Sequence, residues 1–205
     1  GLPTIVYGSG RTDSGVHAQG QVAHIRVRSK LALRKIQSGL NHYLPLDISI
    51  LLIERMPASF HAQFSARRKV YEYRVLNSQV RSPLRRLRSF QVWDQLNLSR
   101  MKKAAELLTG RHDFRVFESS GGRRKSAVRT IRKFQIAKQG NLILFTVEAD
   151  GFLYKMVRSM VGTLIEIGRS RLALPDFKKA LISGNRHFTG PTVPPQGLTL
   201  KRVIY

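Results

Sequence analysis

GSGRTDSGVHAQG, residues 8–20, is the stretch around which the rest of the chain is organised. Three glycines lie within its first eight residues, and glycine permits tight backbone turns that other residues resist. Arg11 and Asp13 are two residues apart, so their side chains can form an ion pair or share an anion site. In such a loop Asp13 can act as a nucleophile or general base, or its carboxylate can simply cap backbone N–H groups of a turn. The loop by itself leaves both interpretations open.

The composition indicates a polyanionic partner. The 205 residues include 36 Lys and Arg against 12 Asp and Glu, a formal net charge of +24. Such an excess is self-repulsive, and nucleic acid is the partner that best explains it, ahead of a membrane surface, because no lipidation motif is visible. The chain has no cysteine, which excludes disulfides and thiolate chemistry, and its histidines lack the spacing of a zinc site. With no apolar run of about 18 residues, the sequence predicts a cytoplasmic protein without a membrane span.

The first part of the chain is predicted to hold the loop between two strands, followed by a helix and a third strand. Hydrophobic patterning places these elements over Leu2–Tyr7, Gln21–Arg28, Leu31–Tyr43 and Ile48–Arg55. Pro57 then breaks the chain, and a domain boundary is predicted there. The expected domains are residues 1–58, containing the Asp13 loop, and residues 59–205.

An aromatic strand is predicted over Val70–Asn77, directly after a basic run that includes Arg67 and Arg68. Because strand side chains alternate, Tyr71 and Tyr73 share one face. Tyrosines beside cations can stack a base and hold its phosphate, so Arg67 and Arg68 are candidate RNA ligands. The alternative is that both tyrosines are core residues with hydrogen-bonded hydroxyls.

The remaining chain alternates predicted helices, strands and basic loops. Periodicity predicts regular elements over Leu98–Thr109, Val128–Ala137, Leu142–Ala149, Gly151–Arg169, Asp176–Ser183 and Leu198–Tyr205. Arg81–Arg88 is a basic loop predicted to touch phosphate. A second cationic loop, which is either solvated or in contact with RNA, contains the candidate RNA ligands Arg123, Arg124 and Lys125. Arg158 lies beside the apolar stripe of its helix, where a lone arginine is usually a surface residue.

Two long motifs resemble those of the TruA family of tRNA pseudouridine synthases. They are GRTDSGVHAQGQVAH, residues 10–24, and GFLYKMVRSMVGTLIEIGR, residues 151–169. Two shorter matches are the Phe-Ser-Ala run at residues 64–66 that leads to Tyr71-x-Tyr73, and PQGL at residues 195–198. All follow the family's order along the chain.

The resemblance implies roles for individual residues. Asp13 matches the catalytic aspartate, Tyr71 the active-site tyrosine, and Arg158 the arginine that contacts the catalytic aspartate. Arg11 matches the residue that fills the gap left in the RNA stem. The implied fold is α+β, with two ferredoxin-like or RRM-like pieces whose antiparallel sheets flank a basic cleft. Family members begin with a further strand and helix, so the first strand and helix of the N-terminal piece are expected to be missing here.

The implied activity is isomerisation of uridine to pseudouridine in the anticodon stem-loop of tRNA, at positions 38 to 40, by a homodimer that needs no cofactor or metal. The reaction exchanges one glycosidic bond for another, which a nucleophile and acid–base steps can achieve. The alternative is a noncatalytic basic RNA-binding protein or a truncated, inactive synthase. A DNA-binding module is disfavoured because no helix-turn-helix or zinc pattern is present.

Overall fold

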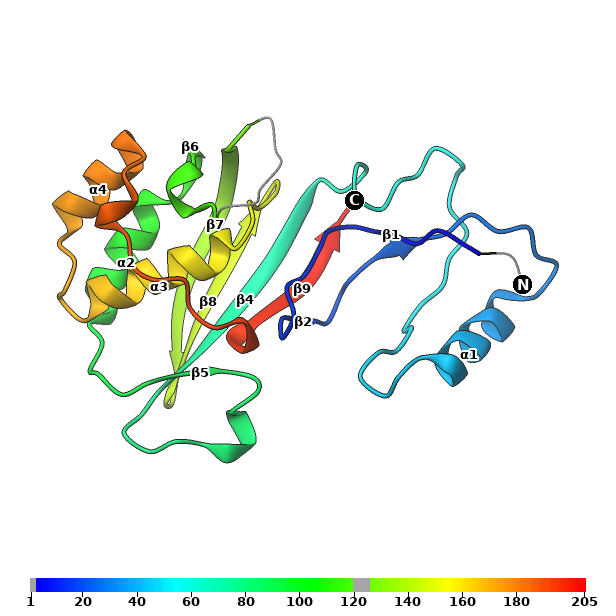
Figure 1. The fold of residues 1–205 in the computed structure, drawn as a ribbon, viewed down its shortest axis with the longest axis horizontal. Helices are drawn as coiled ribbons and strands as arrows, with labels where there is room; N and C mark the ends of the chain where they lie inside the picture. The colour runs from blue at the N-terminus through cyan, green and yellow to red at the C-terminus, as the bar shows by residue number, and fades with distance from the viewer. Residues whose placement is uncertain (1–2, 120–125) are drawn as a thin grey trace. The chain divides into compact units, whose positions relative to one another are not determined.

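The computed structural model describes residues 3–119 and 126–205, and the chain separates into two compact units (Figure 1). Unit 1 comprises Gly1–Ser9 with Val22–Ser65, and unit 2 comprises Gly10–Gln21 with Ala66–Tyr205. The loop that carries Asp13 therefore belongs to the same unit as the C-terminal part of the chain. This membership follows from strand β2 (His17–Ala18), which pairs in parallel with β9 (Leu198–Ile204).

From residue 3 onward, unit 1 contains one short strand pair and one helix. Strand β1 (Tyr7–Gly8) pairs antiparallel with β3 (Ala23–His24). The longer strands expected over Leu2–Tyr7 and Gln21–Arg28 are therefore wrong in extent, because only these two-residue segments are paired. Helix α1 (Leu33–Tyr43) confirms the predicted helix.

The strand expected over Ile48–Arg55 is wrong, since this segment forms no strand and its Leu51 and Leu52 side chains are 76% and 70% exposed. Its backbone groups are instead taken by side chains of α1. Asn41 donates to the Ile50 carbonyl at 3.0 Å and accepts from the Ile50 N–H at 2.6 Å, while Gln37 donates to the same carbonyl at 2.9 Å. A β-rich run forms a strand only where a neighbouring strand supplies hydrogen-bond partners.

An aromatic and histidine cluster packs the hairpin of unit 1. The Tyr7 and His24 rings are stacked with centroids 4.9 Å apart, and the His61 ring lies 4.7 Å from that of His24. The Ala62 N–H donates to His24 Nδ1 at 3.1 Å. Desolvation, reinforced by His61 and Arg26, lowers the pKa of His24. These histidines thus serve as packing and hydrogen-bonding groups.

Unit 2 is built on a mixed sheet in the order β2-β9-β4-β8-β7-β6, with β5 paired to the end of β4. Its long strands are antiparallel to their neighbours, as the register of β4 with β8 and with β9 shows. The bounds of the other strands are β4 Arg68–Asn77, β5 Phe90–Val92, β6 Gly110–Asp113, β7 Val128–Gln139 and β8 Leu142–Ala149. The predicted aromatic strand, β-hairpin and terminal strand are confirmed.

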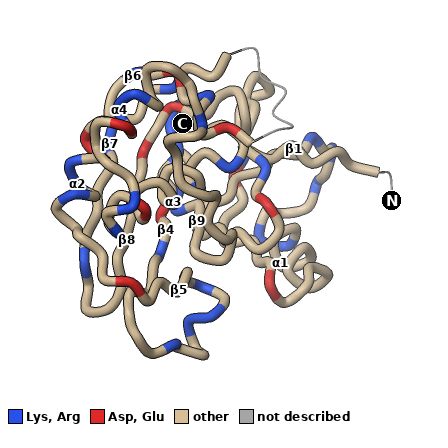
Figure 2. Tube along the Cα trace, turned by 60° about the vertical axis from the view of Figure 1, so that its left-hand side comes forward, with Lys and Arg blue, Asp and Glu red and all other residues tan. Residues whose placement is uncertain are grey.

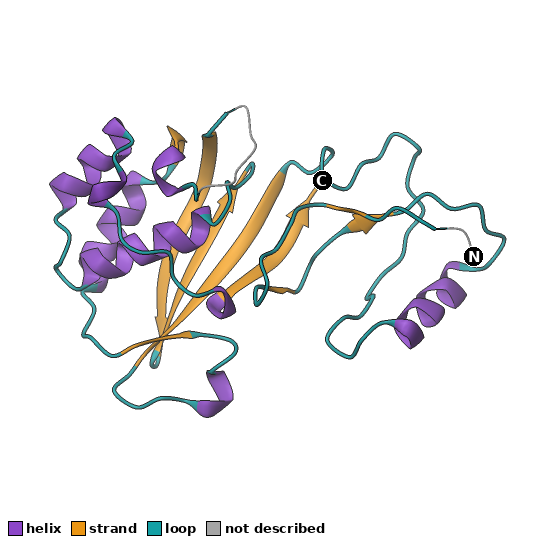
Figure 3. Cartoon of the chain, in the orientation of Figure 1, coloured by secondary structure: helices purple, strands orange, loops and turns teal. Residues whose placement is uncertain are grey.

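Three helices gather on one side of this sheet (Figure 3). They are α2 (Leu98–Leu107), α3 (Met156–Gly168) and α4 (Leu174–Ser183). Side chains along β8 alternate between buried and half-buried, which is the pattern of a sheet covered on one face. Four short 3₁₀ turns, η1 to η4, cover Pro83–Arg85, Arg115–Phe117, Arg186–Phe188 and Pro195–Gly197.

The fold is α+β, as the sequence predicts. Helix α3 is buried along nearly its whole length and begins later than the expected Gly151, because Lys155 adopts a left-handed conformation (φ 58°) immediately before it. None of the helices in residues 3–119 and 126–205 has the length and apolar character needed to span a bilayer.

Candidate active site

Asp13 and Arg158 form a close ion pair in unit 2. Arg158 Nη1 lies 2.6 Å from Asp13 Oδ2, across 145 residues of sequence. The Arg158 side chain is 10% exposed and that of Asp13 is 25% exposed, so the pair is largely screened from water but Asp13 stays accessible. Among the described residues Asp13 Oδ1 has no hydrogen-bond partner. One carboxylate oxygen is therefore held and the other is available to a ligand.

Backbone contacts fix the loop that carries Asp13. The Val16 N–H donates to the Asp13 carbonyl at 3.0 Å and closes a turn in which Gly15 has a φ of +81°. A Cβ at Gly15 would also lie 3.1 Å from the Pro195 side chain. Glycine is required here both by the left-handed backbone and by this close approach. Gln19 then donates its N–H to the Leu200 carbonyl at 2.8 Å, which anchors the loop to β9.

Helix α3 positions Arg158 beside the loop that carries Asp13. The residue lies in the first turn of the helix, and its Nε donates to the Val193 carbonyl at 2.8 Å. Because Nε and Nη1 are both engaged, the planar guanidinium has a defined orientation toward Asp13. The segment containing Val193 is itself held close to α3, where the Gly190 N–H donates to Thr163 Oγ1 at 3.0 Å.

Gly162 permits this close approach, since a Cβ at this position would lie only 1.8 Å from the Pro191 carbonyl oxygen. Gly162→Ala is therefore expected to destabilise the protein by about 1–3 kcal/mol or more and to lower activity, because the displaced segment carries the Val193 carbonyl. Gly39→Ala, in α1 where nothing lies within 4 Å of the new Cβ, is the control and is expected to stabilise by up to about 1 kcal/mol. Urea unfolding of both variants tests this, and a Gly162→Ala protein as stable as the wild type would contradict it.

The two tyrosines of β4 have different environments. Tyr73 is fully buried and its hydroxyl donates to the Pro194 carbonyl at 2.7 Å. Burial raises the pKa of Tyr73, although the Arg158 cation acts in the opposite direction. Tyr73 is therefore a packing residue. Tyr71 is 9% exposed, packs edge-to-face on Phe152 with centroids 5.0 Å apart, and pairs across the sheet with Leu200, the β9 residue next to the loop strand β2.

The predicted RNA-binding residues differ in whether they are exposed or already form an ion pair within the chain. Arg11 is exposed in the Asp13 loop, and Arg67 is exposed just before β4. Arg68 forms an ion pair with Glu148 at 2.5 Å, which compensates part of its charge. Arg123, Arg124 and Lys125 lie outside the described residues. Among the described residues no group of three or more His, Asp or Glu side chains is arranged to hold a metal ion.

Sequence patterns do not reveal the parts of the site that are backbone groups or close steric contacts. The Val193 carbonyl that orients Arg158 has no side-chain signature. Lys69 was also missed: its Nζ lies 2.8 Å from the position a Cβ would take at Gly10, which places the ammonium beside the Asp13 loop. The available signal was its place in a basic run just before the aromatic strand. Together, the arrangement presents an accessible carboxylate oxygen in a cationic environment, which suits nucleophilic attack on an electrophilic carbon.

Comparison with known proteins identifies the family. A family model described as tRNA pseudouridine synthase matches residues 104–205. The chain is 43% identical over 205 residues to tRNA pseudouridine synthase A of Lactococcus lactis subsp. lactis (strain IL1403), covering 99% of this chain and 81% of that protein. It is 40% identical over 205 residues to the protein of the same name from Clostridium botulinum (strain Eklund 17B / Type B), covering 100% and 84%.

A third relative, tRNA pseudouridine synthase A of Thermoanaerobacter sp. (strain X514), is 41% identical over 198 residues, covering 97% of this chain and 81% of that protein. These identities extend over nearly the whole chain and over about four-fifths of each relative. The chain therefore belongs to the tRNA pseudouridine synthase A (TruA) family, a family of isomerases.

Proposed function

We propose that the chain is a tRNA pseudouridine synthase that converts uridine to pseudouridine in the anticodon stem-loop, at positions 38 to 40. The observation that carries the proposal is the Asp13–Arg158 pair, in which one carboxylate oxygen is bound by the guanidinium and the other is accessible. Membership of the family supplies the reaction class, and the +24 charge suits an RNA substrate.

Asp13 is the proposed nucleophile. It attacks the uridine through Oδ1, either at the ribose C1′ or at a carbon of the uracil ring. The N1–C1′ bond breaks, the base reorients, and a C5–C1′ bond forms. The bond to Asp13 Oδ1 then breaks and regenerates the carboxylate, while the proton lost from C5 is balanced by one gained at N1. The product is an isomer of the substrate, so no cofactor is consumed. Arg158 orients the carboxylate for this attack.

Two further residues are assigned to handling the base. A uridine in a stem must leave the base stack before it can react. Tyr71 is proposed to pack against the extruded base and to assist removal of the C5 proton. Arg11, exposed in the same loop as Asp13, is proposed to occupy the gap left in the stem. Arg67, Arg68, Arg123, Arg124 and Lys125 are proposed to contact RNA phosphates.

Several broader features belong to the same proposal. The ferredoxin-like character is supported in unit 2 by antiparallel strands covered on one side by helices. Domains at residues 1–58 and 59–205, a homodimer with tRNA spanning both subunits, and a cytoplasmic location stay predictions. A noncatalytic RNA-binding protein is not favoured, because phosphate binding alone does not require an accessible carboxylate held against a partly buried arginine.

Tritium release from an anticodon stem-loop RNA tests the proposed activity. With uridine labelled at C5, the wild-type chain is expected to release tritium from positions 38 to 40 and from no other uridine. Binding is expected to weaken by about 10³-fold or more between 50 and 200 mM salt if six or more phosphates are neutralised. An RNA that is bound with this salt dependence but never isomerised would favour the noncatalytic alternative.

A further inference from the structure

The segment between β4 and β5 is a cationic surface loop. We call residues 78–89 the arginine loop; it contains Arg81, Arg85, Arg86 and Arg88 and has no acidic residue. The arginines of this loop are coloured blue in Figure 2. Within the described part of the chain, none of these four arginines forms an ion pair with a carboxylate. Four uncompensated guanidinium groups in eight residues are a strong local attraction for anions.

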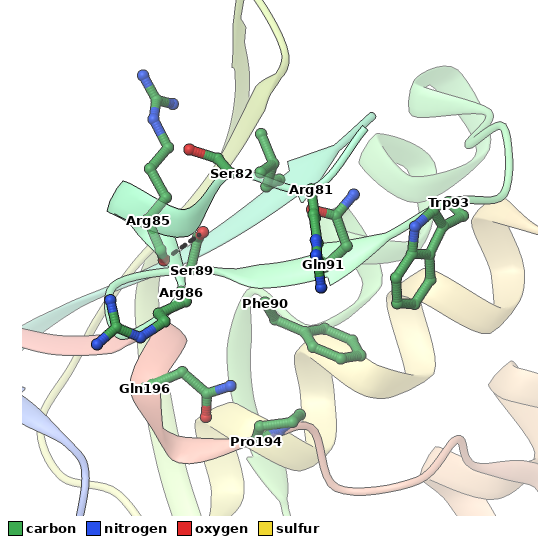
Figure 4. Close-up of a pocket in the computed structure, with 11 residues that line it drawn as sticks. Arg81, Ser82, Arg85, Arg86, Ser89, Phe90, Gln91, Trp93, Pro194 and Gln196 are labelled. Atoms are coloured by element: carbon green, nitrogen blue, oxygen red, sulfur yellow. Dashed lines mark hydrogen bonds between the residues drawn. The ribbon is translucent and has the colours of Figure 1, made fainter. Parts of the chain in front are cut away.

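A cavity of about 280 Å³ lies beneath this loop. Its apolar surface comes from Leu76, Phe90, Trp93 and Pro194, and its polar groups come from Arg81, Ser82, Arg85, Arg86, Ser89, Gln91 and Gln196. In Figure 4 the Phe90 and Trp93 rings and Pro194 stand on one side of the view and Arg85 and Arg86 on the other, with Arg81 between them. The Arg85 side chain extends away from the remaining groups.

The lining matches the chemistry of a single nucleotide. Aromatic rings stack nucleobases of any sequence, and Trp93, at 55% exposed, presents its ring to solvent. Guanidinium groups bind phosphate oxygens in a fork geometry. At about 280 Å³ the cavity lies near the lower end of the usual 300–1,000 Å³ of ligand pockets, a size that suits one nucleotide. A protein partner is less suited, because it would have to place carboxylates against Arg81 and Arg86 beside an apolar wall in one small pocket.

The cavity shares a wall with the Asp13–Arg158 site. The Pro194 carbonyl accepts the Tyr73 hydroxyl, and the neighbouring Val193 carbonyl accepts Arg158 Nε. The Pro194 and Gln196 side chains line the cavity. The Asp13 loop and the arginine loop are also joined directly by a hydrogen bond. His17, four residues after Asp13, donates from its Nε2 to the Leu87 carbonyl at 2.6 Å. The segment that contains Val193 and Pro194 therefore lies between the cavity and the Asp13–Arg158 pair.

We propose that this cavity binds one nucleotide flanking the target uridine on the same RNA strand, with its base against Phe90 and Trp93 and its phosphate on Arg81 and Arg86. The inference rests on the proposed function and adds a second anchoring point to it. Because stacking is sequence-tolerant, the site senses the presence of a base rather than its identity. Occupancy by a neighbouring nucleotide would hold the strand while the uridine is extruded.

Trp93 provides a direct test because it is the chain's only tryptophan. Wild-type fluorescence is expected to be quenched on titration with an unlabelled anticodon stem-loop, and less so when the flanking nucleotide on one side of the target is abasic. Uridine monophosphate alone is expected to quench only at much higher concentration, since it lacks the remaining phosphate contacts. Quenching by the mononucleotide but not by the stem-loop would overturn the proposal, as would equal quenching by the intact and both abasic RNAs.

Matched variants separate pocket binding from general charge. Arg86→Gln and Trp93→Leu are each expected to raise the KM for the stem-loop about tenfold, with kcat changed little. Arg111→Gln is the control: it removes the same charge from an exposed position on β6 that does not line the cavity, and its KM is expected to rise less than threefold. Equal losses in Arg86→Gln and Arg111→Gln would overturn the proposal. A wild type that quenches but releases no tritium would count against the proposed function alone.

Discussion

Replacing Asp13 with asparagine is expected to lower the rate of pseudouridine formation by about 10⁴-fold or more, which is the usual scale for removing a nucleophile. The amide keeps an oxygen that can accept from Arg158, so the loop and the guanidinium should keep their places. Affinity for the stem-loop is expected to stay within about threefold, because binding depends mainly on phosphate contacts. Tritium release and a binding titration on the same preparation measure both quantities.

Asp113→Asn is the matched control. Asp113 also pairs with an arginine, at 2.6 Å from Arg115, and the side-chain hydrogen bond from Arg115 lowers its pKa. It lies on β6, at the opposite edge of the sheet from β2 and the Asp13 loop. The control is expected to keep wild-type turnover. Retention of full activity by Asp13→Asn, or an equal loss in both variants, would refute the assignment of Asp13 as nucleophile.

Arg158→Lys is expected to lower kcat by about 10²-fold, the scale associated with a displacement of about 1 Å at a reacting group. Lysine keeps the positive charge but cannot bind the Asp13 carboxylate and the Val193 carbonyl through one rigid plane. The Asp13 carboxylate would keep a cationic neighbour and lose its defined orientation. The loss should therefore fall on kcat and leave the KM for RNA nearly unchanged, which steady-state kinetics on the stem-loop measures.

Arg169→Lys gives the comparison for Arg158→Lys. Arg169 immediately follows the same helix, is 18% exposed on its side chain, and pairs with Asp94 and Glu166, each at 2.7 Å. An Arg-to-Lys change there perturbs a partly buried ion-pair network without touching Asp13. Its kcat is expected to match the wild type even if its unfolding temperature falls. A silent Arg158→Lys would show that the Asp13–Arg158 contact has no part in catalysis.

Elements with strong local signals were predicted well. The β7–β8 hairpin has two alternating strands around Gly140, whose φ of +57° suits the turn. Helix α4 begins beside Pro175 and ends at Gly184, which has a φ of 71°. In both cases one short stretch of sequence contains the strand or helix pattern and the residue that ends it, so no distant contact is needed for the prediction.

The strands expected in unit 1 were predicted poorly. The run Ile48–Arg55 has strand-forming residues, but side chains of α1 take the backbone groups of Ile50 in place of a neighbouring strand. The first two predicted strands are reduced to two residues each, because the pairing between β1 and β3 is confined to Tyr7–Gly8 and Ala23–His24. Propensity describes what a segment can form, and its neighbours decide whether it does.

The amino-acid sequence by itself determined the α+β class and, through its motifs, the family and the identity of Asp13, Tyr71 and Arg158 as candidate residues. Its charge predicts a polyanionic partner. Only the tertiary structure decided that the Asp13 loop joins unit 2 through β2 and β9, and that the Val193 carbonyl orients Arg158. Motifs record side chains, so the resemblance implied the contact between Asp13 and Arg158 across 145 residues. A backbone carbonyl has no residue type, so no motif marks the Val193 carbonyl, and its role exists only once the chain has folded.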